Sequence, residues 1–241
     1  MLYIIFGIVV LMAVAAVIAY WQLIVAEGAY LGSRVVALLY DWFASRYDGV
    51  KQFDPTNDAV MLAEPVLRHL QGADATHLRS DRPGASHLIL DVATGTGRLP
   101  AALMMQPAFT GRIIAIDASA KMLDIAHAKL KAYSDRIEWQ RADAQRLKFE
   151  DGAFDVVTSL EALEFFSNPK LALSEMIRVL KPGSLLMVSN RIGPDAWKLP
   201  GKTQPTYEFM ALLESLGIGM VRREDWLVDY DLVLGIKLGN G

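Results

Sequence analysis

The residues Leu90-Asp-Val-Ala-Thr-Gly-Thr-Gly-Arg98 decide the fold of this 241-residue chain. They follow the apolar run His87–Asp91, which is typical of a buried strand, and they precede a helical pattern. Gly95 and Gly97 allow a tight turn and let a ligand approach the main chain closely. Asp91 ends the predicted strand, and ligands of open α/β sheets bind beyond the carboxyl ends of the strands. We therefore expect a ligand site here, with the Asp91 carboxylate suited to a cationic ammonium group.

Short apolar runs alternate with helical patterns beyond this turn. The predicted strands are residues 87–91, 112–117, 136–140, 154–158, 185–189, 219–228 and 231–237, with a turn at 181–184 before the fifth. The predicted helices are residues 98–105, 119–132 with Ser119 as N-cap, 169–180 and 207–216. Continuous apolar strands that alternate with helices indicate a parallel sheet covered on both faces, and a short turn joins the last two strands as an antiparallel hairpin. The sequence predicts a doubly wound, mostly parallel seven-stranded α/β sheet with an antiparallel C-terminal hairpin.

The composition excludes several classes of protein. Hydrophobic residues make up 53% of the chain and charged residues 21%, which is too apolar for a disordered chain. A net charge of −3 at pH 7 provides no basic field, so we expect no nucleic-acid partner. The chain has no cysteine, which excludes disulfides, zinc ribbons and thiol catalysis, and its four histidines show no metal-ligand spacing. We therefore predict no metal site.

The first 26 residues are expected to form a transmembrane anchor. No charged side chain occurs between Leu2 and Val25, a stretch that measures roughly 36 Å as a helix and exceeds a hydrocarbon core of about 30 Å. Tyr3, Tyr20 and Trp21 lie near its two ends, where amphipathic rings favour the membrane interface. A cleaved signal peptide remains the alternative, although no basic residue precedes the apolar run and the run is longer than a signal core.

Basic residues follow this apolar stretch but do not precede it. Arg34, Arg46 and Lys51 are the first of them. The positive-inside rule therefore places the bulk of the chain in the cytoplasm. The predicted location is a membrane, with a single-pass N-terminal anchor and the bilayer itself as a partner.

Residues 27–86 are expected to form a helical lead-in to the sheet domain, which occupies residues 87–241. Apolar side chains recur at helical spacing at Leu31, Val35, Leu38, Leu39, Trp42 and Phe43. Such a face either lies on a membrane or packs on the following domain, and both interpretations stay open. A further helix is predicted to begin at Asn57 or Asp58 as its N-cap, and residues 71–86 are predicted to be a surface loop.

Acidic residues at three strand ends distinguish between nucleotide cofactors. Asp117 ends the second strand, where a carboxylate can accept hydrogen bonds from ribose hydroxyls. Asp143 follows the third strand and could accept a bond from an adenine amino group. A dinucleotide-binding fingerprint requires a third glycine where this chain has Pro100, and the Asp91 carboxylate disfavours a pyrophosphate. An NAD-dependent oxidoreductase is therefore disfavoured.

These motifs together resemble the class I S-adenosylmethionine-dependent methyltransferases over roughly residues 41–237. Asp91–Gly97 is similar to the glycine motif of the ubiquinone/menaquinone biosynthesis methyltransferases, the methyltransferase type 11 group. Leu39–Asp48 resembles the Tyr-Asp segment that folds over the cofactor in those enzymes. The resemblance implies a Rossmann-like methyltransferase fold with S-adenosyl-L-methionine as cofactor. Ala93 stands where the wider class commonly has glycine.

The resemblance also implies which residues contact the cofactor. They are Tyr47, Asp91, Ala93, Thr94, Gly95, Gly97, Asp117, Ala118, Met122, Asp143, Ala144 and Ser159. The residues of the glycine motif would surround the methionine part, and Asp117 would hold the ribose. Met122 would pack on the adenine, while Asp143 and Ala144 would contact its edge. Ser159 would lie beneath the sulfonium.

The catalytic residues are not assigned by the resemblance, because the segment after the fourth strand lacks the Gly-Leu-Arg-Asn pattern of quinone C-methyltransferases. Glu161 and Glu164 are candidates for a base on the ligand face, or alternatively acids in a solvated turn. Residues 191–205 follow the fifth strand and are the expected site of acceptor specificity. Aromatic residues that would line an acceptor pocket, or serve as ordinary packing, are Tyr40, Trp42, Tyr47, Phe165, Phe166, Trp197 and Tyr207.

The favoured function is a membrane-anchored methyltransferase, its catalytic domain on the cytoplasmic side, acting on a lipophilic small molecule. A quinone precursor and a phospholipid headgroup are the two acceptor classes considered, because an anchor raises encounter with membrane-borne substrates. The alternatives are a methyltransferase of a soluble metabolite or protein, and a catalytically inactive cofactor-binding membrane scaffold. The sequence leaves open the acceptor atom and the oligomeric state.

Overall fold

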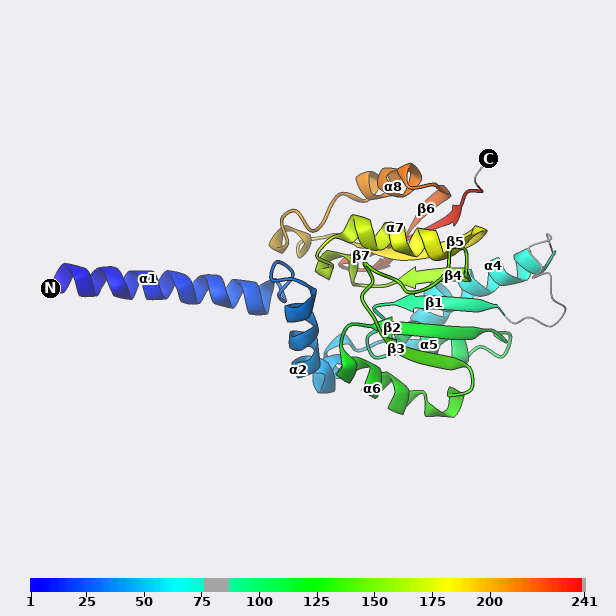
Figure 1. Ribbon diagram of the computed structural model, residues 1–241, viewed down its shortest axis with the longest axis horizontal. Coiled ribbons are helices and arrows are strands. Elements are labelled where there is room, and N and C mark those ends of the chain that lie inside the picture. The colour runs from blue at the N-terminus through cyan, green and yellow to red at the C-terminus, as the bar shows by residue number, and fades with distance from the viewer. Residues whose placement is uncertain (76–86, 240–241) are drawn as a thin grey trace.

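A seven-stranded sheet forms the centre of the computed structural model, which describes residues 1–75 and 87–239 (Figure 1). The strand order is β3-β2-β1-β4-β5-β7-β6. The strands are β1 Leu88–Val92, β2 Arg112–Asp117, β3 Ile137–Arg141, β4 Phe154–Ser159, β5 Leu180–Arg191, β6 Ile218–Leu227 and β7 Tyr230–Lys237. β7 pairs antiparallel with β5 and β6, and all other neighbours are parallel. The predicted mostly parallel sheet with an antiparallel C-terminal hairpin is confirmed.

The position of β1 fixes where the glycine-rich turn emerges. β1 lies between β2 and β4, and four of its five residues are buried, as expected of a strand covered on both faces. Asp91 pairs in register with Ala115 of β2 and with Thr158 of β4. The strand order reverses at this point, which is where ligands of open α/β sheets bind.

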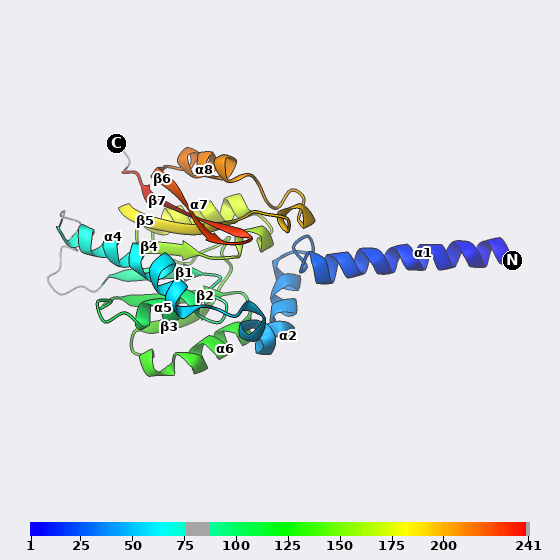
Figure 2. The ribbon, with the colours of Figure 1, turned by 180° about the vertical axis from the view of Figure 1, so that it is seen from behind.

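Helices cover both faces of the sheet. They are α3 Pro55–Asp58, a π-helical turn Ala59–Ala63, α4 Glu64–Ala75, α5 Arg98–Met104, α6 Ala120–Lys129, α7 Pro169–Val179 and α8 Thr206–Ser215. In Figure 1, α7 lies in front of the sheet. Figure 2 shows the molecule from behind, with α4 on the opposite face of the sheet. Leu62, Val66 and Leu103 belong to the hydrophobic core on one face, whereas Leu173 and Phe209 belong to the core on the other. Burial on both faces accounts for the continuous apolar strands.

The helical segment before the glycine-rich turn begins earlier than predicted. Its N-cap is Asp54, whose carboxylate accepts a hydrogen bond from the Thr56 N–H at 2.9 Å. Pro55 favours this start because the first helical position needs no N–H donor. The prediction that Asn57 or Asp58 is the cap is therefore wrong, and the Asp58 side chain is instead buried.

Two further boundaries differ from expectation, and one cap agrees with it. β5 begins at Leu180, so residues 181–184 belong to the strand rather than to a turn, and its pairing with β4 is irregular there. Residues 71–75 of the predicted loop are helical in α4, and the rest of that loop lies outside the described residues. Ser119 caps α6 as predicted, because its hydroxyl accepts a hydrogen bond from the Met122 N–H at 3.1 Å.

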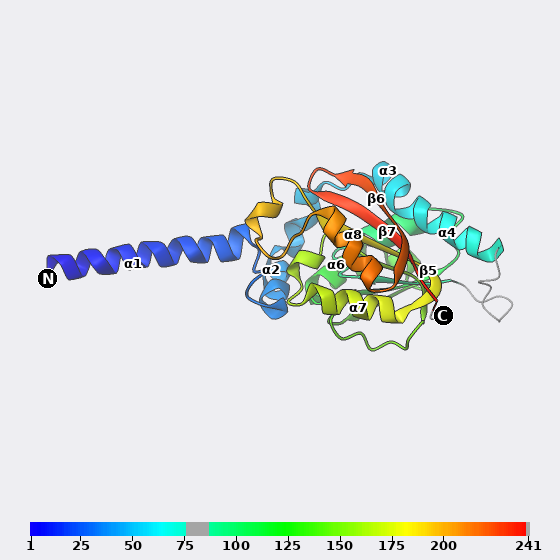
Figure 3. The ribbon, with the colours of Figure 1, turned by 90° about the horizontal axis from the view of Figure 1, so that it is seen from above.

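The N-terminal helix projects away from the sheet. α1 Leu2–Tyr20 continues into a π-helical turn, Trp21–Val25, and Figure 3 shows it extending from a base beside α2 Ser33–Lys51. The segment Tyr3–Val25 is long and apolar enough to cross a membrane, and it is not buried against the rest of the chain. These features do not fit a core helix, whereas a membrane anchor and a signal sequence both fit them.

α2 has one face on the domain and one face away from it. Ala37 and Ala44 are buried, whereas the side chains of Leu38 and Trp42 are 67% and 69% exposed. The two interpretations of this amphipathic segment are therefore compatible, because it packs on the domain and also presents apolar side chains outward.

Candidate functional site

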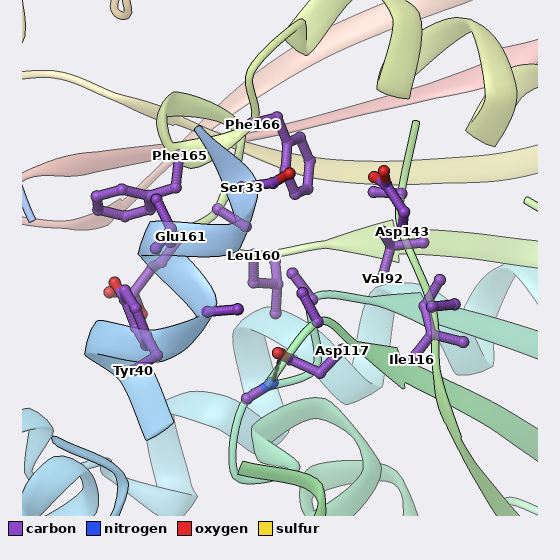
Figure 4. Close-up of a pocket in the computed structure, with 18 of the residues that line it drawn as sticks. Ser33, Tyr40, Val92, Ile116, Asp117, Asp143, Leu160, Glu161, Phe165 and Phe166 are labelled. Atoms are coloured by element: carbon purple, nitrogen blue, oxygen red, sulfur yellow. Dashed lines mark hydrogen bonds between the residues drawn. The ribbon is translucent and has the colours of Figure 1, made fainter. Parts of the chain in front are cut away.

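A cavity of about 720 Å³, part of it open to solvent, lies between α2 and the carboxyl ends of the parallel strands. Figure 4 shows the part of α2 that carries Ser33 and Tyr40 opposite the strand ends that carry Val92, Ile116 and Asp117. Segments that follow β3 and β4 complete its wall. An apolar lining with a few polar groups is typical of a site for a small molecule.

The carboxylate of Asp117 organises one wall of this cavity. It accepts hydrogen bonds from the Gly95 N–H and the Ser119 N–H, each at 2.8 Å. Burial raises the pKa of Asp117, although these backbone donors act in the opposite direction. The bond to Gly95 ties the end of β2 to the glycine-rich turn, and each carboxylate oxygen keeps a lone pair for a ligand hydroxyl.

A smaller cavity adjoins the first one at the glycine-rich turn. The two share Tyr47, Ala93 and Gly95 among their lining residues. The smaller cavity is also lined by Asp91 and Arg98, which carry opposite charges. A ligand that extends into it would find partners for one cationic group and one anionic group.

Asp91 is held in place by two hydroxyl groups. Thr94 Oγ1 and Thr158 Oγ1 each donate a hydrogen bond to the Asp91 carboxylate at 2.6 Å, and the β1–β4 register supplies Thr158. Burial raises the pKa of Asp91 to about 6, while the two threonine donors act in the opposite direction. Asp91 forms no ion pair within residues 1–75 and 87–239, so a ligand cation would supply its missing counter-charge.

Arg98 connects the smaller cavity to the helices that precede the sheet. Its Nη2 donates to Asp58 Oδ1 at 2.6 Å, and its Nη1 donates to Glu161 Oε1 at 2.7 Å. The guanidinium lies 4.6 Å from the ring centre of Phe53 and 4.5 Å from that of Trp226. These contacts fix the guanidinium between two rings and balance its charge, and they leave one N–H on each of Nη1 and Nη2 for a ligand.

The structure brings nine of the twelve predicted cofactor contacts to these two cavities. Tyr47, Ala93, Gly95, Asp117, Ala118, Asp143 and Ala144 line the larger of them, and Asp91 and Thr94 line the smaller. Gly97, Met122 and Ser159 line neither. Met122 and Ser159 are buried inside the fold, which hydropathy alone could not distinguish from contact with a ligand.

Gly97 has a packing role that a substitution can test. A Cβ atom there would lie 3.1 Å from Trp139, at a φ of 80°. We expect Gly97→Ala to lower the melting temperature more than Gly201→Ala, whose φ is 75° but whose added Cβ would have nothing within 4 Å. Strain costs about 1 kcal/mol at both positions, and overpacking adds about 1–3 kcal/mol at Gly97. Thermal unfolding in detergent measures both, and equal losses would contradict a packing role.

Glu161 and Glu164 are enclosed, so the expectation of acids in a solvated turn is wrong. The Glu161 side chain is 6% exposed and pairs with both Lys51 and Arg98. Glu164 is 2% exposed and accepts a hydrogen bond from the Tyr230 hydroxyl. The turn after β4 folds back against the rest of the chain, and local sequence gives no signal for those distant partners.

A larger cavity of about 1480 Å³, also partly open to solvent, meets the first one beside α2. The two share Tyr40, Tyr47, Glu161 and Phe165. From there the larger cavity extends to Leu23 and Ile24, in the π-helical turn that ends the apolar N-terminal helix. We call it the acceptor cavity, and the first two together the cofactor cavity.

Two polar residues that line the acceptor cavity were not predicted from the sequence. Glu27 accepts a hydrogen bond from the Tyr40 hydroxyl at 2.9 Å. Tyr230 begins β7 and pairs in register with Arg191 at the end of β5. Arg191 opens the segment predicted to carry acceptor specificity, but the register that brings Tyr230 to it cannot be read from periodicity.

The aromatic residues divide between the cavities and the outer surface. Those that line one or both cavities are Tyr40, Trp42, Tyr47, Phe165 and Phe166. Trp197 and Tyr207 line neither, and their side chains are 73% and 72% exposed. The predicted aromatic residues that line the cavities therefore come from α2 and from the turn after β4, and Tyr230 of β7 adds a further ring to the acceptor cavity.

Comparison with known proteins agrees with this geometry. A family model described as a methyltransferase domain matches residues 90–188. The ubiquinone/menaquinone biosynthesis C-methyltransferase UbiE of Hahella chejuensis is 32% identical over 179 residues, which cover 73% of this chain and 67% of the relative. The chain belongs to the class I S-adenosylmethionine-dependent methyltransferases.

Further relatives and solved structures show how far the similarity extends. A demethylmenaquinone methyltransferase of Clavibacter sepedonicus is 40% identical over 153 residues, which cover 64% of this chain and 56% of the relative. The chain spans between 46% and 67% of the length of the first curated relatives that it matches. A SAM-dependent methyltransferase from Aquifex aeolicus aligns with a TM-score of 0.53 and 23% identity, covering 77% of this chain and all of that one. The [4+2]-cyclase SpnF aligns with a TM-score of 0.63 and 18% identity, and the alignment covers 87% of this chain and 98% of that one.

The residues present fit S-adenosylmethionine, the cofactor of the family to which the chain belongs. A nucleoside matches the first cavity, where Asp117 and Asp143 offer carboxylate acceptors. The amino-acid group of the cofactor matches the smaller cavity, where Asp91 offers a carboxylate without a counter-charge and Arg98, held by Asp58 and Glu161, offers its remaining N–H donors. The fit rests on the joined shape of the cavities and on the chemistry of these four side chains.

Proposed function

We propose that the chain is a membrane-anchored S-adenosylmethionine-dependent methyltransferase whose acceptor is a lipophilic molecule of the quinone-precursor class. The observation that carries the proposal is the acceptor cavity, which runs from the cofactor cavity at Tyr40 and Tyr47 to Leu23 and Ile24 at the base of the apolar helix. A molecule with a reactive ring and a hydrocarbon tail fits this path, with its ring beside the cofactor. The names of the relatives, a UbiE C-methyltransferase of ubiquinone/menaquinone biosynthesis and a demethylmenaquinone methyltransferase, favour a quinone precursor.

In this proposal, four charged side chains hold the cofactor. Asp117 accepts hydrogen bonds from the ribose hydroxyls, and Asp143 accepts one from the adenine amino group. Asp91 faces the ammonium of the methionine part, and Arg98 faces its carboxylate. The threonines that hold Asp91 and the rings that hold Arg98 keep both groups in position before the cofactor binds.

Alignment is the main contribution of the chain to catalysis. When bound, S-adenosylmethionine supplies an electrophilic methyl group on a sulfonium. The acceptor atom must approach that methyl from the side opposite the sulfur, and correct alignment contributes much of the rate. Tyr40, Tyr47 and Phe165 line the junction of the two cavities, where they restrict the ring of the acceptor and exclude water.

Apolar surface around the outer end of the acceptor cavity supports membrane attachment. Trp42 and Val228 line this cavity and are 69% and 87% exposed. Exposed large apolar side chains that surround a cavity favour contact with an apolar partner, and tryptophan favours the membrane interface. Arg34 and Arg46 follow the apolar helix, which favours the cytoplasmic side for the catalytic domain.

Cofactor affinity is expected to fall at acid pH. Asp91 has a pKa of about 6 without ligand, raised by burial, and an ammonium group beside it would lower that pKa. Binding therefore releases a proton when Asp91 starts protonated, so the Kd for S-adenosylmethionine should increase about tenfold between pH 7.5 and pH 5. Calorimetry at several pH values measures this change. Asp91→Asn should bind more weakly at pH 7.5 and lose this dependence, whereas the same pH dependence in the variant would contradict the assignment.

The Asp91 carboxyl has the opposite pH effect on the stability of the ligand-free protein. A carboxyl with a raised folded-state pKa stabilises the fold below its unfolded pKa, and that stability is lost as pH rises through the folded value of about 6. Protonation of Asp91 at acid pH therefore stabilises the ligand-free fold but weakens cofactor binding. Because the two effects have opposite signs, a loss of binding can be told apart from a loss of structure.

Identification of the molecule that receives a labelled methyl group tests the proposed function. Purified protein in detergent is incubated with methyl-labelled S-adenosylmethionine and a total membrane lipid extract, and the organic phase is separated. We expect wild-type protein to label a quinone-type species, and Asp117→Ala to leave it unlabelled. Label in soluble metabolites or in protein, with none in the organic phase, would contradict the proposal.

A phospholipid amine is a second candidate acceptor, favoured by the acidic groups of the acceptor cavity. Glu27 and Asp229 line it together with aromatic rings, a combination that attracts ammonium groups. Label recovered in a phospholipid headgroup in the same experiment would select this candidate over the quinone precursor.

A further inference from the structure

A buried tyrosine–glutamate pair lies at the inner wall of the acceptor cavity. Tyr230 lines the cavity and donates a hydrogen bond to Glu164 Oε1, which lies behind it. The two side chains belong to residues that are 5% and 2% exposed. They come from the start of β7 and from the turn after β4, so the fold brings together groups that are far apart in the sequence.

Arg191 completes this group and carries an unused donor. Its Nη1 lies 3.3 Å from the same Glu164 oxygen, and its guanidinium lies 5.6 Å from the ring centre of Tyr230. Its Nε is buried and has no hydrogen-bond partner among the described residues. A buried donor without a partner is costly, so Arg191 places an unsatisfied donor in the wall of a cavity that it also lines.

Glu164 differs from Glu161 in the charges around it. Both oxygens of Glu161 contact a cation, Lys51 at one and Arg98 at the other, which opposes uptake of a proton. Glu164 has Arg191 as its single cationic contact in the described part of the chain. Burial raises the pKa of Glu164, with Tyr230 and Arg191 opposing the shift. Glu164 is therefore the better proton acceptor of the two.

We propose that Tyr230, Glu164 and Arg191 form a subsite that binds a hydroxyl group of the methyl acceptor and takes up its proton. This inference deepens the proposed function and rests on it for the reaction. The chemical class that the subsite fits is a ring hydroxyl, such as that of a phenol or a hydroquinone. Tyr230 is the residue that touches the acceptor, and Glu164 acts through it as a positioning and proton-holding residue.

In the proposed subsite, Tyr230 relays the proton of the acceptor hydroxyl to Glu164. The acceptor O–H bond breaks and its proton bonds to the Tyr230 oxygen, while the original Tyr230 proton bonds to Glu164. The electron pair left on the acceptor oxygen raises the electron density of that oxygen and of the ring carbon beside it. The acceptor atom bonds to the methyl carbon as the carbon–sulfur bond breaks, and that electron pair stays on sulfur. For attack by carbon, the ring proton then moves to the oxygen, so one proton remains on Glu164 in either case.

Binding of two matched probes tests the subsite without any turnover. The probes are 4-hexylphenol and 4-hexylanisole, which share the tail and ring but differ in the hydroxyl proton. We expect wild-type protein to bind the phenol at least tenfold more tightly by calorimetry, because its hydroxyl pairs with buried groups. Tyr230→Phe should bind both probes within about threefold of each other. Equal affinities in the wild type would overturn the proposal.

Turnover separates the roles of the two residues. With a tailed hydroquinone as acceptor, we expect Tyr230→Phe and Glu164→Gln each to lower kcat about 100-fold or more, with a smaller change in KM. Glu164→Gln should keep the phenol preference, because Tyr230 still offers its hydroxyl. Both variants should bind S-adenosylmethionine as the wild type does. A variant with unchanged kcat would overturn the proton-accepting role.

An exposed pair of the same chemistry provides the control. Tyr207 donates to Glu208 at 3.0 Å on the surface of α8, outside both cavities. Tyr207→Phe and Glu208→Gln should change neither the probe preference nor kcat. A wild type that methylates no lipid acceptor but still prefers the phenol would contradict the proposed function and support the binding subsite. An active wild type without that preference would overturn the subsite alone.

Discussion

Asp117→Ala is expected to weaken the binding of S-adenosylmethionine about 100-fold. The wild-type carboxylate would make two charge-assisted hydrogen bonds to ribose hydroxyls, and a loss of about 2.8 kcal/mol corresponds to that factor. The substitution also removes the acceptor that ties the Gly95 N–H to the end of β2, so the glycine-rich turn loses part of its preorganisation. Isothermal titration calorimetry at pH 7.5 measures the change.

A matched substitution serves as a control that distinguishes a loss of cofactor binding from a general loss of structure. Asp124→Ala removes an exposed carboxylate from the adjoining helix α6 and should leave the affinity unchanged. Both variants should melt within a few degrees of the wild type. An Asp117→Ala protein that binds the cofactor as tightly as Asp124→Ala would contradict the assignment of the ribose site.

Removal of residues 1–20 is expected to lower methylation of a vesicle-borne acceptor at least 100-fold. The truncation retains Leu23 and Ile24, so the wall of the acceptor cavity stays complete. The loss arises because a tethered domain meets a bilayer substrate at a high effective concentration, often in the millimolar range, that a free domain lacks. The initial rate with a long-tailed hydroquinone in vesicles, at a fixed protein concentration, measures the effect.

Two comparisons identify the anchor as the cause. The truncated protein should bind S-adenosylmethionine as the full chain does, which reports an intact domain. It should also methylate a short-tailed, water-soluble analogue at a similar rate. Equal activity of both proteins on the vesicle-borne acceptor would assign the N-terminal helix to targeting rather than to substrate access.

The features predicted correctly from the sequence depend on local patterns. The strands before and after the glycine-rich turn could be located because buried parallel strands are continuous apolar runs. The Ser119 cap could be predicted because its side chain bonds a backbone group three residues away. Glycine freedom and strand-end carboxylates pointed to Gly95, Asp91 and Asp117 for the same reason, and all three line the cofactor cavity.

The features that were missed depend on partners distant in the sequence. Asp58 resembles a helix cap, yet it is buried as the ion-pair partner of Arg98, 40 residues later. Glu164 resembles a solvated acid, yet it lies behind Tyr230, 66 residues later. Hydropathy and spacing do not encode which side chains two loops bring together, so the acceptor cavity and its tyrosine–glutamate pair required the structure.

Transfer of labelled methyl groups to a defined acceptor in vesicles tests the central proposal most directly. The full-length protein is reconstituted with a long-tailed hydroquinone that lacks one ring methyl group, and methyl-labelled S-adenosylmethionine is added. We predict saturable incorporation of label into the hydroquinone by the wild type, and none above background by Asp117→Ala. Tight cofactor binding without label in the hydroquinone, together with label in a water-soluble compound, would contradict a lipophilic acceptor reached from the membrane.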